Sequence, residues 1–191
     1  MATLPILQVG HPVLRERARE VSRDELASPE VQTLIDDMIE TMRAAGGAGL
    51  AANQIGRALR IAVAEVDHNP RYPYKPPIAL TILVNPVIEP LDSEMVVINE
   101  GCLSVADLRG ELERNVNVRV RYLDRDGHSH DVVKRGLTAG TFQHEIDHLD
   151  GVLFLDRVGD PRTLTTWEHF ERFHREAFVE RITEFVERVG S

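Results

Sequence analysis

Disulfide chemistry is absent from this sequence, because its 191 residues include a single cysteine, Cys102. One cysteine excludes any disulfide within the chain, and it is typical of proteins in a reducing compartment. In such a compartment a lone cysteine is either a small buried apolar side chain or a reactive group. The neighbours of Cys102 must therefore decide its role.

Long apolar runs are absent as well. No run approaches the roughly 20 residues that cross a bilayer, and the N-terminus lacks a basic segment followed by an apolar stretch. We therefore expect a soluble, cytoplasmic protein that has no targeting peptide and no membrane partner.

Positive charge is in deficit, since 22 lysines and arginines oppose 31 aspartates and glutamates and give a net charge of -9. A broad nucleic-acid surface needs clustered cations, so no specific nucleic-acid partner is expected. The composition is otherwise that of a globular protein, with 42% apolar and 28% charged residues. A chain of this length fits one core, and residues 1–191 are predicted to form a single domain.

The first half of the chain predicts one helix and two short strands. The segment 28–42 begins with the helix-start signal Ser-Pro-Glu and continues with apolar residues at helical spacing. The small residues 44–49 end this helix and let the backbone approach another group, such as a ligand, closely. Residues 61–66 and 81–84 are typical of strands, and the proline-rich residues 70–77 between them are typical of a surface loop.

The second half predicts a hairpin followed by two helices. Apolar and polar residues alternate over 116–122, as in a strand with one buried face, and Asp126-Gly127 indicates a hairpin turn. From Thr138 the spacing becomes helical, and Gly151 stands where a C-terminal cap would. A last helix is predicted to begin at Asp160-Pro161. Its later apolar residues lie on roughly one stripe, which is typical of core packing: Trp167, Phe170, Phe173, Val179, Ile182, Phe185, Val186 and Val189.

These elements together predict an α+β fold. Its sheets would be mostly antiparallel and would surround a central helix, with further helices near the N-terminus and the C-terminus.

Residues 144–148 (HEIDH) carry the clearest chemical signal. On a helix, His144 and His148 lie on one face, so both imidazoles can reach one metal ion while Glu145 stands beside a water molecule as general base. The alternative without a functional role is an exposed histidine pair on a polar helix face. Ile146 sets this helix against a core, however, and thereby favours histidines that point inward.

A catalytic metal needs a third protein ligand and an open position. The metzincin protease pattern would place a histidine where this chain has Phe154, so that family is excluded. A gluzincin-type metallopeptidase would use a downstream glutamate, Glu168 or Glu171. The other candidate is Cys102, because a thiolate is a strong ligand and because residues 100–104 form a turn that contains glycine. The residues alone leave both possibilities open.

Three segments together resemble the motifs of peptide deformylases. They are residues 47–54 (GAGLAANQ), 100–104 (EGCLS) and 143–148 (QHEIDH), which match G-x-G-L-A-A-x-Q, E-G-C-L-S and Q-H-E-x-D-H in the same order. The similarity begins at residues 9–15 and continues to 149–154, so it covers most of the chain.

The resemblance implies a metal-dependent hydrolase. Its substrates and partners would be newly made polypeptides with an N-terminal formylmethionine, from which it would remove the formyl group as formate. The metal ligands would be Cys102, His144 and His148, and Glu145 would be the general base and later the acid. The metal would be Fe(II), which zinc, nickel or cobalt replaces in isolated members.

The same resemblance implies three further roles. The side chain of Gln54 and the backbone N–H of Leu103 would stabilise the oxyanion, and Gly49 would bring its backbone beside the substrate chain. In bacterial members a C-terminal helix is implicated in ribosome docking, which favours basic residues. From Trp167 onward this chain has six glutamates and four arginines, a net charge of -2, so docking by this helix is not expected.

Two departures from the family pattern lie at the rim of the site. Val105 is followed by Ala106 where the family commonly has proline, and residues 69–77 form a longer segment than in compact bacterial members. They are the support for a different hypothesis, a deformylase-like protein that binds metal or formyl peptide without turnover. His128 and His130 flank the predicted hairpin turn and are interpreted as exposed residues.

Overall fold

The computed structural model describes residues 2–67 and 73–191, and within them helices pack against two antiparallel sheets. The larger sheet contains, in spatial order, β1 (Gly49–Ala51), β2 (Ile61–Val66), β3 (Ile78–Pro90), β6 (Asn117–Leu123) and β7 (Ser129–Arg135). The smaller sheet contains β4 (Met95–Cys102), β5 (Val105–Asn115) and β8 (Thr165–Thr166). Neighbouring strands are antiparallel throughout, in agreement with the α+β prediction.

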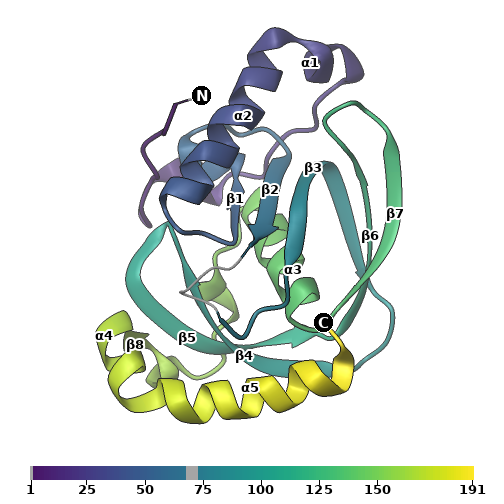
Figure 1. Cartoon of the computed structure of the whole chain (residues 1–191). Helices are drawn as coiled ribbons and strands as arrows, with labels where there is room; N and C mark the ends of the chain where they lie inside the picture. Colours follow the sequence, from purple (N-terminus) through teal and green to yellow (C-terminus); the bar gives the residue numbers. More distant parts are fainter. Residues whose placement is uncertain (1, 68–72) are drawn as a thin grey trace.

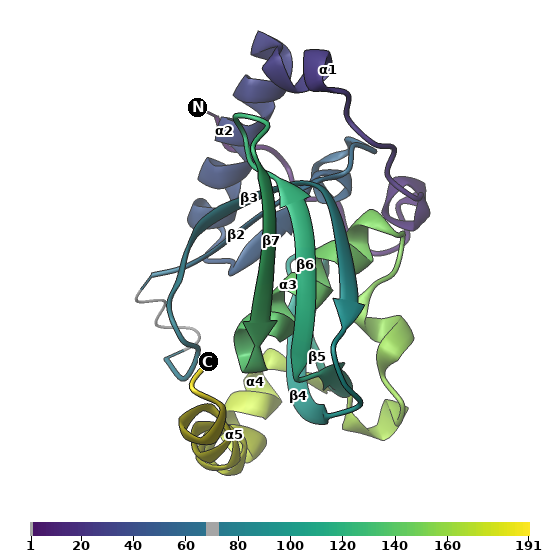
Figure 2. The same ribbon diagram turned by 90° about the vertical axis from the view of Figure 1, so that its right-hand side faces the viewer.

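The α-helices are α1 (Arg23–Ala27), α2 (Pro29–Ala44), α3 (Gly136–Leu149), α4 (Trp167–His169) and α5 (Arg175–Val189). Shorter turns are the 3-10 segments η1 (Pro12–Arg15), η2 (Ala52–Ile55), η3 (Phe154–Arg157) and η4 (Pro161–Thr163), and the π turn η5 (Phe170–His174). Helices α2 and α5 lie at opposite ends of the molecule, with α3 between them (Figures 1 and 2). In the described ranges, no helix combines the length and the apolar character that crossing a bilayer requires.

Several elements lie where local signals place them. The hydroxyl of Ser28 caps α2, as the helix-start signal predicts. Strand β2 has the predicted bounds, whereas β3 extends well beyond the predicted 81–84 because its second half pairs with β6 instead of β2. Strands β6 and β7 form the predicted hairpin around Asp126-Gly127. The predicted loop 70–77 lies partly outside the described residues, and its described part, 73–77, contains neither helix nor strand.

Helix α3 is held in place by its apolar face. Gly136 at its start and Gly151 just after its end both have left-handed backbone, with φ of 55° and 76°, and Gly151 confirms the predicted cap. The residues of α3 that are buried in a common core with the larger sheet are Ala139, Phe142, Ile146 and Leu149. Since that face is occupied, the polar residues of α3 lie on its other sides.

The last helix begins later than predicted. Asp160 caps only the single turn η4, because the chain then extends as β8 and pairs with β5 through Thr165 and Thr166. Helix α4 begins at Trp167, where the Thr166 hydroxyl accepts a hydrogen bond from the His169 N–H. A short strand pairing that the local sequence does not signal therefore displaces the helix start.

The predicted apolar stripe of this helix is wrong at one position. Phe173 is 62% exposed and stacks on His169, whereas the buried residues of this segment are Phe170, Phe178, Ile182 and Phe185. The π turn at 170–174 supplies the reason, since an i→i+5 turn adds a residue and rotates the later residues relative to α-helical spacing.

We expect the two phenylalanines to differ sharply on truncation. Phe185→Ala should lower the free energy of unfolding by about 3–5 kcal/mol, because it removes a ring that is 7% exposed and leaves a cavity. Phe173→Ala, the matched control, should change it by less than about 0.5 kcal/mol. Urea unfolding measures both. Equal losses would mean that the π turn does not set the buried face.

Candidate metal centre

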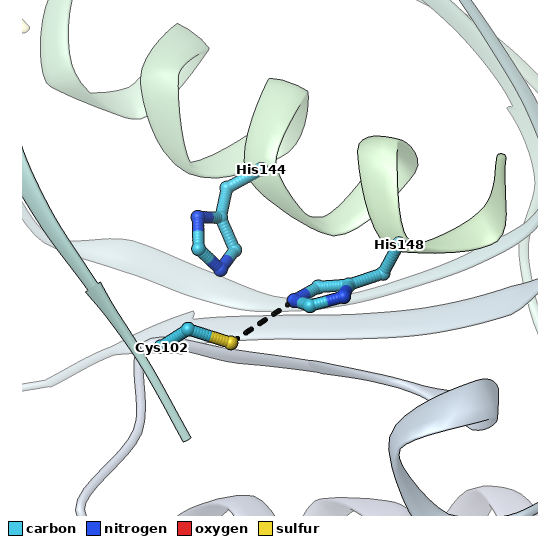
Figure 3. A group of neighbouring side chains, drawn as sticks. All are labelled: Cys102, His144 and His148. Carbon is cyan, nitrogen blue, oxygen red and sulfur yellow. Dashed lines mark hydrogen bonds between the residues drawn. The ribbon is translucent and has the colours of Figure 1, made fainter. Parts of the chain in front are cut away.

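Three side chains from two elements converge beside α3. Cys102 ends β4, and His144 and His148 lie one turn apart on α3, with one ligand atom from each residue within 4.8 Å of the other two. Both rings approach the sulfur, and the Sγ of Cys102 lies 3.2 Å from Nε2 of His148 (Figure 3). The residue pair at i and i+4 thus forms the face that its spacing predicted, and Cys102 joins it.

The position of Cys102 comes from a tight turn between β4 and β5. The register of this pair shifts after Gly101, and Cys102 pairs directly with Val105, so only two residues make the turn. The Ser104 N–H points back to Sγ at 3.3 Å. The turn therefore presents the sulfur to α3 and supplies it with a hydrogen-bond donor.

A buried network orients His144. Glu100 on β4 accepts a hydrogen bond from Nδ1 of His144 at 2.8 Å, and the same carboxylate accepts two from Arg114 on β5. Arg114 also donates to Asp147 of α3 at 2.6 Å, and Arg157 pairs with the same carboxylate. Because Nδ1 is occupied, His144 has Nε2 available as its metal-binding atom.

Burial and charge set the protonation of this network. Burial raises the pKa of Glu100, but Arg114 and His144 outweigh it and hold the pKa of that carboxyl well below its usual range. Burial, together with the neighbouring His144, lowers the pKa of His148 and keeps it neutral. Burial acts the same way on His144, but Glu100 and Cys102 overcome it and raise its pKa. A metal that binds here must therefore displace protons.

Glu145 is buried beside the group of three. It is 4% exposed, and its Oε2 atom has no hydrogen-bond partner among the described residues. Burial is the main cause that raises its pKa to about 7. A side chain at Gly49 would overlap the Glu145 carboxylate. The close backbone approach that residues 44–49 indicated is therefore an approach to Glu145.

Gln54 and Leu103 line the same cavity as Cys102, His144 and Glu145. The Oε1 atom of Gln54 accepts from the Ala51 N–H at 2.8 Å, which directs its Nε2 toward Ser104 Oγ at 3.0 Å and Cys102 Sγ at 3.6 Å. Gln54 is thereby fixed with its donor end toward the sulfur.

Sequence reasoning missed several residues of this site. Arg114 carries no motif of its own. Glu100 pairs with Gly110 in the register of β4 and β5, and the long side chain of Arg114, four residues further along β5, reaches back to the Glu100 carboxylate. Tyr74, Lys75 and Phe178 line the cavity from a loop and from α5, which no local spacing connects to α3. One weak signal exists for Lys75, since the chain has only two lysines.

The other candidate ligands lie elsewhere. Glu168 and Glu171 are exposed, neither belongs to a group of metal-binding atoms among the described residues, and Glu171 pairs with Arg175. At the tip of the hairpin, Asp124 contacts both His128 and His130. His128 is exposed, as interpreted from the sequence, whereas His130 is half-buried and stacks on Tyr122 with 4.9 Å between ring centroids.

Comparisons with known proteins point in one direction. A family model described as polypeptide deformylase matches residues 3–163. Peptide deformylase 1 of Nitrosomonas europaea is 42% identical over 158 residues, which cover 83% of this chain and 89% of that protein. Peptide deformylase 2 of Ralstonia nicotianae is 46% identical over 156 residues, which cover 82% and 87%.

Solved structures agree with these sequence matches. The crystal structure of a class I type b peptide deformylase from Acinetobacter baumannii with bound Met-Ala-Ser has a TM-score of 0.79 and 40% identity, and the match covers 82% of this chain and 99% of that one. A peptide deformylase from Thermotoga maritima has a TM-score of 0.73 and 36% identity, with 84% and 100% covered.

Removing the Arg114 guanidinium should destabilise the fold. In Arg114→Met, Glu100 keeps only His144 and Asp147 keeps only Arg157 as a cationic partner. The loss of the buried guanidinium between the two carboxylates should cost about 3–5 kcal/mol of unfolding free energy. The same change at Arg119, whose pairing with Asp131 is exposed, is the control and should cost far less. Similar losses in the two variants, measured by denaturant unfolding, would contradict a dominant role for the buried network.

Proposed function

The chain belongs to the peptide deformylase family of metal-dependent hydrolases, and we propose that it removes the N-formyl group from the initiator methionine of new polypeptides at the site built by Cys102, His144, His148 and Glu145. The observation that carries this proposal is the buried Glu145 carboxylate beside three converging ligand atoms, with one of its oxygens lacking a hydrogen-bond partner among the described residues. Glu145 lines the same cavity as two of the candidate ligands, Cys102 and His144. Such a carboxylate is suited to bind and activate a water molecule.

The proposed metal ligands fit a divalent transition metal. One thiol sulfur and two imidazole nitrogens are donors that iron and zinc both accept, and three protein ligands leave a position for substrate or water. We propose Fe(II) as the native ion, with zinc, nickel or cobalt as replacements. When bound, the ion supplies Lewis-acid activation of water and of the formyl carbonyl.

Glu145 is proposed to move the proton. It takes a proton from the attacking water as the water oxygen bonds to the formyl carbon, and it gives that proton to the amide nitrogen as the C–N bond breaks. Formate and a free amino terminus result. A pKa of about 7 suits both roles near neutral pH, because the carboxyl is neither too weak a base nor too weak an acid.

The remaining residues are proposed to position the substrate. The Nε2 of Gln54 and the backbone N–H of Leu103 would donate to the developing oxyanion. Strand β1 is an edge strand, so Gly49 pairs with Ala64 on one side and leaves its other side to an extended peptide. We propose that residues 1–191 act as one catalytic unit, in the cytoplasm, where new polypeptides meet a reducing environment.

The alternatives have less support. A gluzincin-type peptidase would need Glu168 or Glu171 at the metal, and both are exposed outside the group of three. A protein that only binds formyl peptide would not need a buried carboxyl with a raised pKa beside the ligands. Ribosome docking through α5 is not proposed, because the glutamates of this segment outnumber its arginines.

Metal content separates the two ligand sets. Cys102→Ala should abolish stoichiometric metal binding, because it removes one of three ligands, whereas Glu168→Ala should keep about one ion per chain. Elemental analysis after dialysis measures both. Metal retained without Cys102 and lost without Glu168 would favour the peptidase.

Formate release from formyl-Met-Ala tests the reaction itself. The wild-type protein should release formate, and the acetyl peptide of the same sequence serves as the control for a general amidase. Glu145→Gln should keep the metal and lose roughly 100- to 10,000-fold in turnover, since it removes the acid-base group. Near-normal turnover by a metal-loaded Glu145→Gln protein would exclude the proposed proton transfer.

A further inference from the structure

A lysine lines the same cavity as two of the candidate metal ligands, Cys102 and His144. Lys75 belongs to the described segment 73–77, and it is one of only two lysines in a chain that otherwise uses arginine. The cavity has a volume of about 680 Å³, including its open mouth, and Lys75 lines it together with Gly49, Glu145 and Cys102. The proposed reaction does not use Lys75.

A hydroxyl group anchors the amine of Lys75 to α3. Nζ donates to Oγ1 of Thr141 at 3.1 Å, while the Thr141 hydroxyl donates to the Leu137 carbonyl at 3.2 Å. Burial lowers the pKa of Lys75 to about 8, against the nearby carboxylates of Glu100 and Glu145. The amine is thus still mostly protonated at neutral pH, and the cavity contains a cation.

The cavity that contains this cation has an apolar wall as well as polar lining residues. Ile98 and Leu137 line this part of the cavity, and the rings of Tyr74 and Phe178 meet edge to face at 5.2 Å between centroids. Gly140 lies close to Ile98, so a β-carbon there would approach the Ile98 side chain to 3.1 Å and narrow the space. The apolar wall of the pocket is thus formed by Ile98, Leu137, Tyr74 and Phe178. Lys75 and Thr141 are polar, and the rest of the cavity lining also includes Asn99, Glu100 and the guanidinium-bearing Arg109.

The first side chain of a bound substrate should point toward this polar end. Thr141 precedes Glu145 by one helical turn, so both residues lie on the face of α3 that lines the cavity. If the formyl group lies at Glu145, the side chain on the Cα atom of the first substrate residue extends along this face toward Thr141 and Lys75. Its outer atoms would meet a charged donor.

We propose that Lys75, held by Thr141, gives the side-chain pocket a polar end, so that the enzyme also deformylates peptides whose first side chain ends in a strong hydrogen-bond acceptor, as methionine sulfoxide does. The inference rests on the proposed deformylase function. The reaction is unchanged, because water still cleaves the formyl C–N bond and the sulfoxide takes no part. An apolar pocket would strip water from the sulfoxide oxygen without replacing its hydrogen bond, whereas a cationic donor replaces it.

Three peptides and four proteins test the inference. The peptides are formyl-Met-Ala, the same peptide with methionine sulfoxide, and the same peptide with norleucine. The proteins are the wild type, Lys75→Met, Thr141→Val and the control Lys134→Met, which removes the second lysine of the chain, on β7. We expect wild-type kcat/KM for the sulfoxide to lie within about 10-fold of that for methionine. Lys75→Met should lower the sulfoxide-to-norleucine ratio about 10-fold or more, as loss of a charged hydrogen bond does.

The controls separate the possible failures. Thr141→Val should lower the same ratio, because it removes the hydroxyl that holds Lys75, and Lys134→Met should leave it unchanged. An unchanged ratio in both pocket variants, with norleucine peptide still turned over, overturns the role of Lys75 and leaves deformylation intact. Absence of formate from all three peptides with the metal-loaded wild type overturns the proposed function instead. A ratio that also falls in Lys134→Met overturns the inference as a nonspecific charge effect.

Discussion

One buried guanidinium connects the parts of this site. Arg114 lies on β5 and is 2% exposed, yet it binds Glu100 on β4 and Asp147 on α3 at the same time. Buried charges are costly unless each is compensated, so these three groups can be buried only in one relative position of the smaller sheet and α3. That position directs Glu100 to His144 and places the end of β4, with Cys102, opposite the histidine pair. The geometry of the candidate centre thus depends on an interaction that includes none of the three candidate ligands.

The same network explains why the pKa values of two carboxyl groups close to the candidate metal ligands shift in opposite directions. Glu100 lies between two cationic partners, which hold its pKa down, whereas Glu145 lies against Gly49 and burial raises its pKa to about 7. One carboxylate is therefore permanently ionised and structural, and the other is able to accept and release a proton. Two similar residues acquire opposite chemistry from their surroundings alone.

The sequence predicts the residues of the candidate centre better than the residues that line the rest of its cavity. The HEIDH spacing predicts the face shared by His144 and His148, and alternation over 116–122 predicts a half-buried strand, because both signals are local periods that the backbone converts directly into geometry. The C-terminal segment was harder. Its start depends on the pairing of Thr165 with β5, and its buried face depends on a π turn, neither of which has a local signature. Lys75 is a residue of the same kind, since only the packing of a loop on α3 brings its amine to Thr141.

X-ray absorption at the metal edge tests most directly whether one sulfur and two imidazoles hold the metal. For the zinc-loaded wild-type protein we expect one sulfur scatterer at about 2.3 Å and nitrogen or oxygen scatterers at about 2.0–2.1 Å, with outer-shell imidazole features from two histidines. Cys102→Ala should lose the sulfur signal. A first shell of nitrogen and oxygen alone in the wild-type protein would contradict the assignment of Cys102, and with it the site described above.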